Sequence, residues 1–184
     1  MKNKLIAAIV MMAFSAGVYG QKYFTKTGKV SFFSETPVEN IEAVTNSAST
    51  VIDLESGKIQ WAVLIKSFEF EKALMQEHFN ENYMESTKYP KAKFKGQVLN
   101  HESLNFQKDG VYDVDVKGIL EIHGVKNEIT TSATFEVENG EIKARSNFKV
   151  SVADYGIEIP SVVRENIAKE IEIKITGKYE SLSS

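Results

Sequence analysis

Hydrophobic and polar residues alternate with a two-residue period along most of the second half of the chain. Val114, Val116 and Leu120 fall on one face of a segment whose intervening positions are mostly charged. Because successive side chains of a β-strand point to opposite faces, this pattern predicts a strand with one buried face. The same alternation returns over residues 129–137, 142–152 and 171–175. Four such strands in series predict an antiparallel sheet with one dry and one solvated face.

The first half of the chain predicts further strands, which are shorter. They are expected over residues 23–25, 29–34, 38–46, 50–54, 58–65 and 93–100, with a loop at Asn46–Ser49 and a hairpin turn at Glu55–Gly57. The total is about eight strands or slightly more, and eight is the number at which an antiparallel barrel closes around packed side chains or one slender ligand. Periodicity alone leaves a closed barrel and a flat sandwich open.

A helical insertion interrupts the strands near the middle of the chain. Phe70, Leu74 and His78 fall on one stripe at helical spacing, with charged residues beside them, and this predicts a helix over residues 71–79. Residues 80–88 predict a second short helix or an irregular loop, and a short helical cap is expected over residues 161–169.

The N-terminus has the pattern of a secretory signal peptide. Lys2 and Lys4 precede an apolar stretch that is too short to span a bilayer, and small residues follow it. Val18 and Gly20 occupy the −3 and −1 positions of the expected cleavage site. We therefore expect residues 1–20 to be a signal peptide and residues 21–184 to be one exported, soluble domain. No cysteine lies near the cut, so no lipid attachment and no stable membrane anchor are expected.

The composition of the mature chain excludes several partners and chemistries. Without residues 1–20, 20 basic residues face 25 acidic ones, which gives a net charge of −5. Nucleic-acid binding needs a basic stripe, which this sequence lacks. Because the sequence contains no cysteine, disulfides, thiolate catalysis and cysteine-based metal sites are excluded.

Few residues are candidates for catalysis or metal binding. The three histidines, His78, His101 and His123, do not stand at metal-binding spacing. His101 is expected at a strand end and His123 in a hairpin turn, whereas His78 lies on the helical stripe and is a candidate for ligand contact. Carboxylate pairs such as Asp113 and Asp115 are ordinary on a solvated strand face. A glycine-rich phosphate loop is absent, and we expect no catalytic residue, no metal and no cofactor.

Three separate blocks of the sequence have a distinctive order and spacing. They are Phe68–Met84 with Lys88–Phe94, then Tyr112–Val125, and finally Phe148–Ile157. In order and spacing they resemble the YceI-like family of exported lipid-binding proteins. The resemblance implies an all-β fold with a short helical insertion, namely a lipocalin-like antiparallel β-barrel of about eight strands. It also implies a long isoprenoid chain bound inside the barrel, a periplasmic location and a homodimer. Thr25–Ser34 departs from the family pattern, because the two histidines usual there are missing.

The inward positions of such a barrel are the expected ligand-binding site. We predict that the following residues line the interior or cover its mouth: Trp61, Val63, Leu74, Met75, His78, Phe79, Val114, Val116, Leu120, Phe135, Phe148, Val150 and Ile173. The small residues Gly118, Ala133, Ala144 and Ser146 share the dry faces, which favours an open tube. A core filled by bulky neighbours is the alternative.

The leading hypothesis is a non-enzymatic, exported protein that holds a long-chain isoprenoid or similar amphiphilic lipid inside its barrel. One alternative is a lipid- or quinone-modifying enzyme in the same barrel, which would use His78 or Asp154. The other is a stress or interaction protein with a packed barrel and no ligand. Bound lipid in the purified protein would favour the binding protein, and turnover that needs His78 would favour the enzyme. A dry, ligand-free interior would favour the packed barrel.

Overall fold

Residues 22–182 are described by the computed structural model of the chain, and the predicted signal peptide, residues 1–20, lies outside them. The strands are β1 (Lys22–Glu35), β2 (Asn40–Asp53), β3 (Lys58–Leu64), β4 (Glu69–Phe70), β5 (Lys91–Val98), β6 (Gly110–Ile122), β7 (Val125–Glu138), β8 (Glu141–Ser151) and β9 (Glu170–Ser181). The helical elements are η1 (Ile65–Ser67), α1 (Ala73–His78), η2 (Phe79–Tyr83), η3 (His101–Ser103), η4 (Ala153–Tyr155) and η5 (Ser161–Val163).

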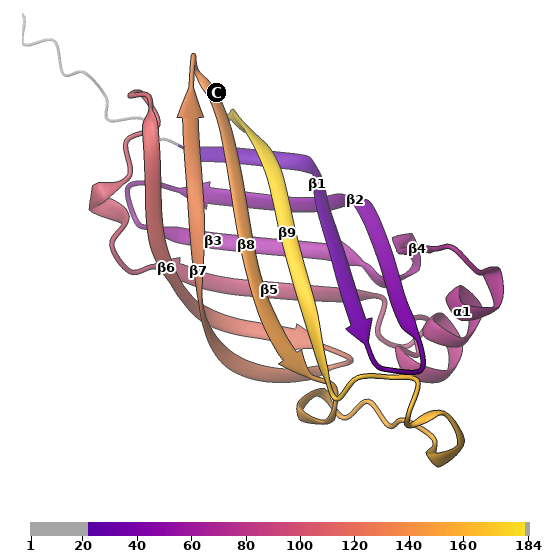
Figure 1. Cartoon of the computed structure of the whole chain (residues 1–184). Helices are drawn as coiled ribbons and strands as arrows, with labels where there is room; N and C mark the ends of the chain where they lie inside the picture. Colours follow the sequence, from indigo (N-terminus) through magenta and orange to yellow (C-terminus); the bar gives the residue numbers. More distant parts are fainter. Residues whose placement is uncertain (1–21, 183–184) are drawn as a thin grey trace, which may run out of the picture.

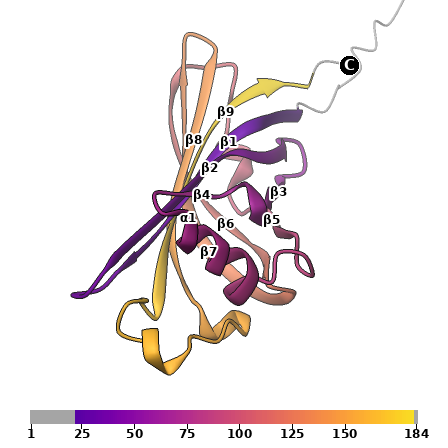
Figure 2. The ribbon, with the colours of Figure 1, turned by 90° about the vertical axis from the view of Figure 1, so that its right-hand side faces the viewer.

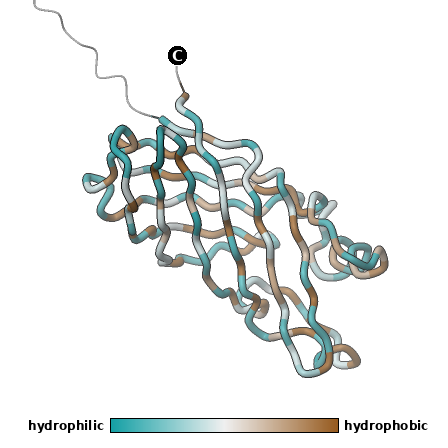
Figure 3. Tube along the Cα trace, turned by 45° about the horizontal axis from the view of Figure 1, so that its top comes forward, coloured by the Kyte–Doolittle hydropathy of each residue, from teal (hydrophilic) through white to brown (hydrophobic). Residues whose placement is uncertain are grey.

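Eight strands close into a barrel in the order β1-β9-β8-β7-β6-β5-β3-β2, because β1 also pairs with β2 (Figure 1). Every neighbouring pair is antiparallel. The two-residue strand β4 pairs with β2 next to β3, where Phe70 lies opposite Ala43. Hydrophobic and hydrophilic residues alternate along the strands, as the sequence predicted (Figure 3). The all-β, lipocalin-like barrel is therefore confirmed, and the sandwich is excluded.

Strands β1 and β2 are each continuous over 14 residues. The sequence predicted two short strands in each, with a loop at Asn46–Ser49, and this prediction was wrong. The register of β1 against β2 shifts on both sides of Gly28. In β2, the buried positions change phase between Thr45 and Ala48. Such β-bulges break the alternation in the sequence without ending the strand.

The helical insertion is one segment, in which α1 continues directly into the π-helical η2. We call residues 73–84 the helical segment; it lies beside the lower end of the barrel (Figures 1 and 2). None of the α1 side chains is buried, whereas Met84, directly after η2, is 6% exposed. The segment is therefore anchored mainly through its C-terminal end. The cap predicted over residues 161–169 is shorter than expected, because only η5 is helical there.

Strands β7 and β8 separate along part of their length. They pair only from Ala133 to Glu138 on β7, so the first half of β7 shares no ladder with the second half of β8. The η4 turn lies beside this unpaired part of β7, where the Asn127 side chain donates a hydrogen bond of 2.7 Å to the Asp154 carbonyl oxygen. The turn places Tyr155, which is 2% exposed, inside the barrel.

One end of the barrel interior is filled by side chains. We call it the closed end, and it consists of Tyr23, Ile52, Ile59, Val98, Leu104, Phe106, Val114, Val116, Phe135, Val137, Ile142 and Tyr179. Leu104 and Phe106 come from the loop between η3 and β6. The other residues belong to the starts of β1, β3, β6 and β8 and to the ends of β2, β5, β7 and β9, which meet in an antiparallel barrel. Phe135 is fully buried, with its ring centroid 5.1 Å from that of Phe106 and 5.9 Å from that of Tyr179.

Candidate functional site

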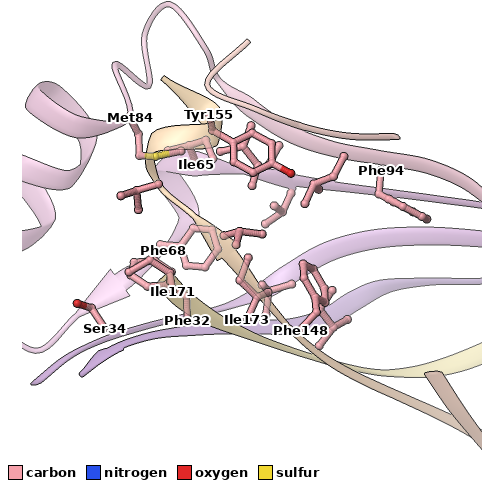
Figure 4. A pocket seen from close by; sticks show the side chains of 18 of the residues that line it. Phe32, Ser34, Ile65, Phe68, Met84, Phe94, Phe148, Tyr155, Ile171 and Ile173 are labelled. Carbon is pink, nitrogen blue, oxygen red and sulfur yellow. The ribbon is translucent and has the colours of Figure 1, made fainter. Parts of the chain in front are cut away.

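The rest of the barrel contains a cavity of about 380 Å³. This volume falls within the range of small-molecule sites in proteins, about 300–1,000 Å³. All eight barrel strands contribute to its lining, together with the helical segment and the stretch from η4 to η5. Apolar side chains such as Phe32, Phe148 and Ile173 surround the space (Figure 4). The barrel is thus packed at the closed end and open along the remaining length.

Eleven of the thirteen predicted site residues line this cavity. They are Trp61, Val63, Met75, His78, Phe79, Val116, Leu120, Phe135, Phe148, Val150 and Ile173. They come from five strands and the helical segment, so the barrel brings together residues that are far apart in the sequence. Val116 and Phe135 also belong to the closed end, and they form the floor of the cavity. Their contact with a ligand stays a prediction.

Leu74 and Val114 are not on the cavity lining. Leu74 is 61% exposed, because the cavity-facing stripe of the helical segment runs through Met75, His78 and Phe79 rather than through Leu74. Val114 points inward as expected, but it is 3% exposed and packed within the closed end, where no cavity remains.

Four phenylalanines form an aromatic cluster on the cavity wall. Phe32 of β1 stacks on Phe79 with ring centroids 5.3 Å apart, and Phe68 and Phe70 lie 5.9 Å and 5.0 Å from Phe79. The sequence prediction included only Phe79. The pairing of β4 with β2 brings Phe70 to this wall. The hydrophobic pattern around Phe70 does not predict that pairing. Phe32 lies two residues after Val30 on the same strand face, so the alternation in the sequence does predict that it points inward.

The space above Gly118 is not part of the cavity, contrary to the expectation from its missing side chain. Gly118 lies opposite Gly96 on β5, and the ring of Phe94 covers both. A Cβ atom on Gly118 would lie 2.8 Å from Phe94 Cζ and 2.4 Å from Gly96 Cα. Ala133, Ala144 and Ser146 do line the cavity.

Two buried tyrosines are among the residues that line the cavity. Tyr179 Oη lies 3.2 Å from Thr50 Oγ1, and burial raises the pKa of Tyr179. Burial also raises the pKa of Tyr155, and the neighbouring Asn127 side chain partly offsets this rise. Both hydroxyls therefore stay protonated and neutral near pH 7.

The histidines have separate surroundings. His123 and Gly124 form the β6–β7 turn with positive φ angles, as predicted, and the His123 ring contacts Glu85 Oε2 at 2.9 Å. His101 begins the η3 turn, beyond the end of β5. His78 lies on the cavity lining.

The paired carboxylates form structural contacts on the outer face. Asp113 accepts a hydrogen bond from Thr134, and Asp115 accepts one from Ser132, both from side chains on the neighbouring strand β7. Among residues 22–182, no group of three or more histidines or carboxylates could hold a metal ion. In the same range, no helix has the length and apolar character needed to cross a bilayer.

Comparisons with known proteins identify relatives of this fold. A polyisoprenoid binding domain from Saccharophagus degradans has 18% identity and a TM-score of 0.76, with 88% of this chain and 99% of that chain covered. BcnA from Burkholderia cenocepacia has 17% identity and a TM-score of 0.68, covering 83% and 96%. The YceI protein of Campylobacter jejuni has 17% identity and a TM-score of 0.60, covering 82% and 90%. At such identities, these structures show the fold.

Sequence comparison gives the family. No curated protein sequence matches the chain. The model of the YceI-like domain matches residues 20–179, which is nearly all of the part that the structure describes. The chain therefore belongs to the YceI-like family.

Proposed function

We propose that this protein is a non-enzymatic binding protein that holds a long-chain isoprenoid or similar amphiphilic lipid in its barrel. The observation that carries the proposal is the apolar cavity between the closed end and the helical segment. Burial of hydrocarbon contributes about 25 cal/mol per Å², so a long chain binds there with few polar contacts. The name of the Saccharophagus degradans neighbour, which states polyisoprenoid binding for that protein, supports the choice of ligand class.

The surroundings of the catalytic candidates support a binding role over an enzymatic one. A general base needs a partner that orients it within hydrogen-bond distance. Within residues 22–182, the His78 ring makes no hydrogen bond, and His123 is engaged by Glu85 and by the carbonyl oxygen of Tyr155. The Asp154 main chain, not its carboxylate, makes the contact with β7.

We also propose export to the periplasm, which rests on the sequence of residues 1–20 and on the family. N-terminal sequencing of the exported protein tests this, with Gln21 as the expected first residue. The mass of the purified protein in solution tests the homodimer that the resemblance implies.

The direct test is native mass spectrometry of the protein purified gently from its own host, followed by organic extraction. We expect a stoichiometric long-chain species, which identifies the ligand class. Bare protein that stays bare after incubation with polyisoprenols and quinones would contradict the proposal and leave the cavity as an unfilled core.

A pair of variants on β8 tests the location of the ligand. Ala144 lines the cavity and Lys149 is exposed on the outer face of the same strand. We expect Ala144→Phe to fill part of the cavity and weaken lipid binding by about tenfold or more, which corresponds to about 1.4 kcal/mol, while Lys149→Phe leaves it unchanged. Trp61, the single tryptophan, lines the cavity and reports binding by fluorescence. Equal affinity in the two folded variants would place the ligand elsewhere.

A further inference from the structure

Trp61 and Phe94 lie at the boundary between the closed end and the cavity. They form a cross-strand pair on β3 and β5, and both line the cavity. Both side chains also pack against the buried residues of the closed end. In the close view, Phe94 lies at the opposite end of the lining from Ser34 and Met84 (Figure 4). We call the pair of Trp61 and Phe94 the aromatic stop.

The Trp61 side chain reaches from β3 to β1. A Cβ atom on Gly28 of β1 would lie 3.3 Å from both Cη2 and Cζ3 of the indole ring. Because β2 separates β3 from β1 in the sheet, the ring extends past β2 along the inner face of the barrel. The same ring packs against a second buried cluster, which includes Val30 and Ala48. Trp61 is therefore held across the end of the cavity by residues on both sides.

The Phe94 ring points from the cavity toward the closed end. It lies over the facing glycines Gly96 and Gly118, and its Cζ atom would be 2.5 Å and 2.8 Å from their Cβ atoms. Gly96 is closer to the closed end than Phe94, because β5 runs on to Val98, a residue of the closed end. The two glycines leave a patch of inner wall without side chains, and the ring fills it. Removal of the ring would therefore extend the cavity over the glycine pair.

A bound chain can touch both rings of the aromatic stop. Trp61 and Phe94 are partly exposed and line the cavity, whereas Phe135 of the closed end is fully buried. At the opposite end of the lining, Asn166 donates a hydrogen bond of 3.1 Å to the Glu39 carboxylate. Burial of a polar group without a partner is costly. The apolar end of an amphiphile therefore faces the stop, and its polar end faces the helical segment.

We propose that the aromatic stop determines the length of the hydrocarbon chain that the cavity accepts. This inference rests on the proposed lipid-binding function and narrows its ligand class. The apolar end of the chain abuts Trp61 and Phe94, so a chain of fitting length is buried completely and any further length stays outside the barrel. The ligand is thus a prenyl lipid of limited chain length, and not one that threads through the whole barrel.

The test is a competition between prenols from geraniol, through farnesol and geranylgeraniol, to solanesol, each longer than the one before by one isoprene unit. Native mass spectrometry with two neighbouring prenols at equal concentration gives the ratio of their dissociation constants. Phytol, which matches geranylgeraniol in length, gives the absolute constant by Trp61 fluorescence. In the wild type, we expect each added unit to increase affinity at least about tenfold until the cavity is full, and less than about twofold beyond this length limit.

Variants of Phe94 should move the length limit. Phe94→Ala removes the phenyl ring, which is about the size of one isoprene unit. We expect the limit to rise by one unit, so the first prenol beyond the wild-type limit gains about tenfold in affinity over the prenol at that limit. Phe94→Leu removes less volume and disturbs the packing less, and the same gain should be about threefold. Phe33→Ala is the matched control, because the Phe33 ring packs under Lys174 Nζ outside the cavity lining. Its length limit should equal that of the wild type.

The outcomes separate the inference from the function on which it rests. A wild-type affinity that rises with every added unit up to solanesol overturns the aromatic stop, and so does a limit that both Phe94 variants leave unchanged. A limit that moves equally in Phe33→Ala also overturns it. In these three cases lipid binding stands. If the wild type binds none of the prenols, the proposed function is contradicted and the inference falls with it.

Discussion

At the residue scale, the glycine pair Gly96 and Gly118 shows how closely the neighbouring strands β5 and β6 pack under the Phe94 ring. A Cβ atom on Gly118 would lie 2.4 Å from both Gly96 Cα and the Lys95 carbonyl oxygen. These are backbone atoms, which move only if the strands shift. We expect Gly118→Ala to lower the free energy of unfolding by about 1–3 kcal/mol, the usual cost of overpacking. Urea denaturation measures this.

Gly110, at the start of the same strand, provides the control. A Cβ atom there would lie 3.5 Å from the Tyr112 ring, which is ordinary van der Waals contact, and its φ angle is not in the left-handed region. We expect Gly110→Ala to change stability by less than about 0.5 kcal/mol, as is usual for surface substitutions. If the two alanine variants have the same stability, the strands can shift to accommodate a Cβ atom, and the close contact at Gly118 does not destabilise the variant.

The same scale shows which site residues a sequence predicts. Trp61, Leu120 and Ile173 were found because the two-residue period of a strand fixes which side chains point inward. The role of Gly118 was not predictable. The sequence shows a missing side chain, but the ring that covers it comes from Phe94 on another strand. Whether an inward gap becomes cavity depends on such contacts between distant residues.

At the scale of elements, Glu39 connects two segments that line the cavity. Its carboxylate lies 3.4 Å from Lys72 Nζ, just before α1, and accepts a 3.1 Å hydrogen bond from Asn166, shortly after η5. We expect Glu39→Ala to release both segments and to speed lipid release about two- to fivefold, because partly exposed ion pairs contribute at most about 1 kcal/mol. Stopped-flow release of phytol, followed by Trp61 fluorescence, measures the rate.

Glu141→Ala is the control for this prediction. Glu141 pairs with Lys143 and Lys178 on the outer face near the closed end, away from the helical segment. This variant also removes a carboxylate that forms ion pairs, but one that contacts neither segment, so its release rate should match that of the wild type. Faster release in both variants would indicate a general effect of charge, and no change in Glu39→Ala would show that the two segments move independently of Glu39.

Elements were predicted well where they are regular and poorly where they are bulged or irregular. The long strands β6 to β9 follow an unbroken alternation, and the His123–Gly124 and Asn139–Gly140 turns between them carry the positive φ angles of two-residue hairpins. The phase change between Thr45 and Ala48 has the sequence pattern of a loop, although the strand continues through it. A bulge is stabilised by pairing with a neighbouring strand, and a single strand's sequence does not show that pairing.

At the scale of the whole molecule, the barrel combines two interiors that the sequence presented as alternatives. Val137 and Phe148 both point inward from adjacent strands, yet Val137 is packed within the closed end and Phe148 lines the cavity. Their patterns are alike, because periodicity gives the direction of a side chain and not the number of neighbours that meet it. The resemblance to a family predicted the barrel, but the division into a packed and an open half required the structure.

This division predicts two levels of local stability. Side chains at the cavity lack neighbours on one side and lose their dispersion contacts there, so the strand segments around it should open more readily than the closed end. In the empty protein, we expect amide hydrogen exchange in residues 144–151 and 170–175 to be at least about tenfold faster than in residues 133–138. Exchange measured by mass spectrometry on these peptides tests this. Equal rates would mean that the barrel opens as one unit.

Phytol bound in the cavity should slow amide hydrogen exchange wherever the opening reaction destroys the cavity, so the pattern of slowed amides locates the ligand. If phytol at a hundredfold excess over its dissociation constant binds only the intact cavity, any opening that destroys the cavity costs about 2.7 kcal/mol more. Opening of residues 144–151 removes part of the wall around Phe148 and Val150, so these amides should slow about a hundredfold. A ligand held at the closed end or on the outer surface would survive that opening, and the same amides would then exchange as fast as before.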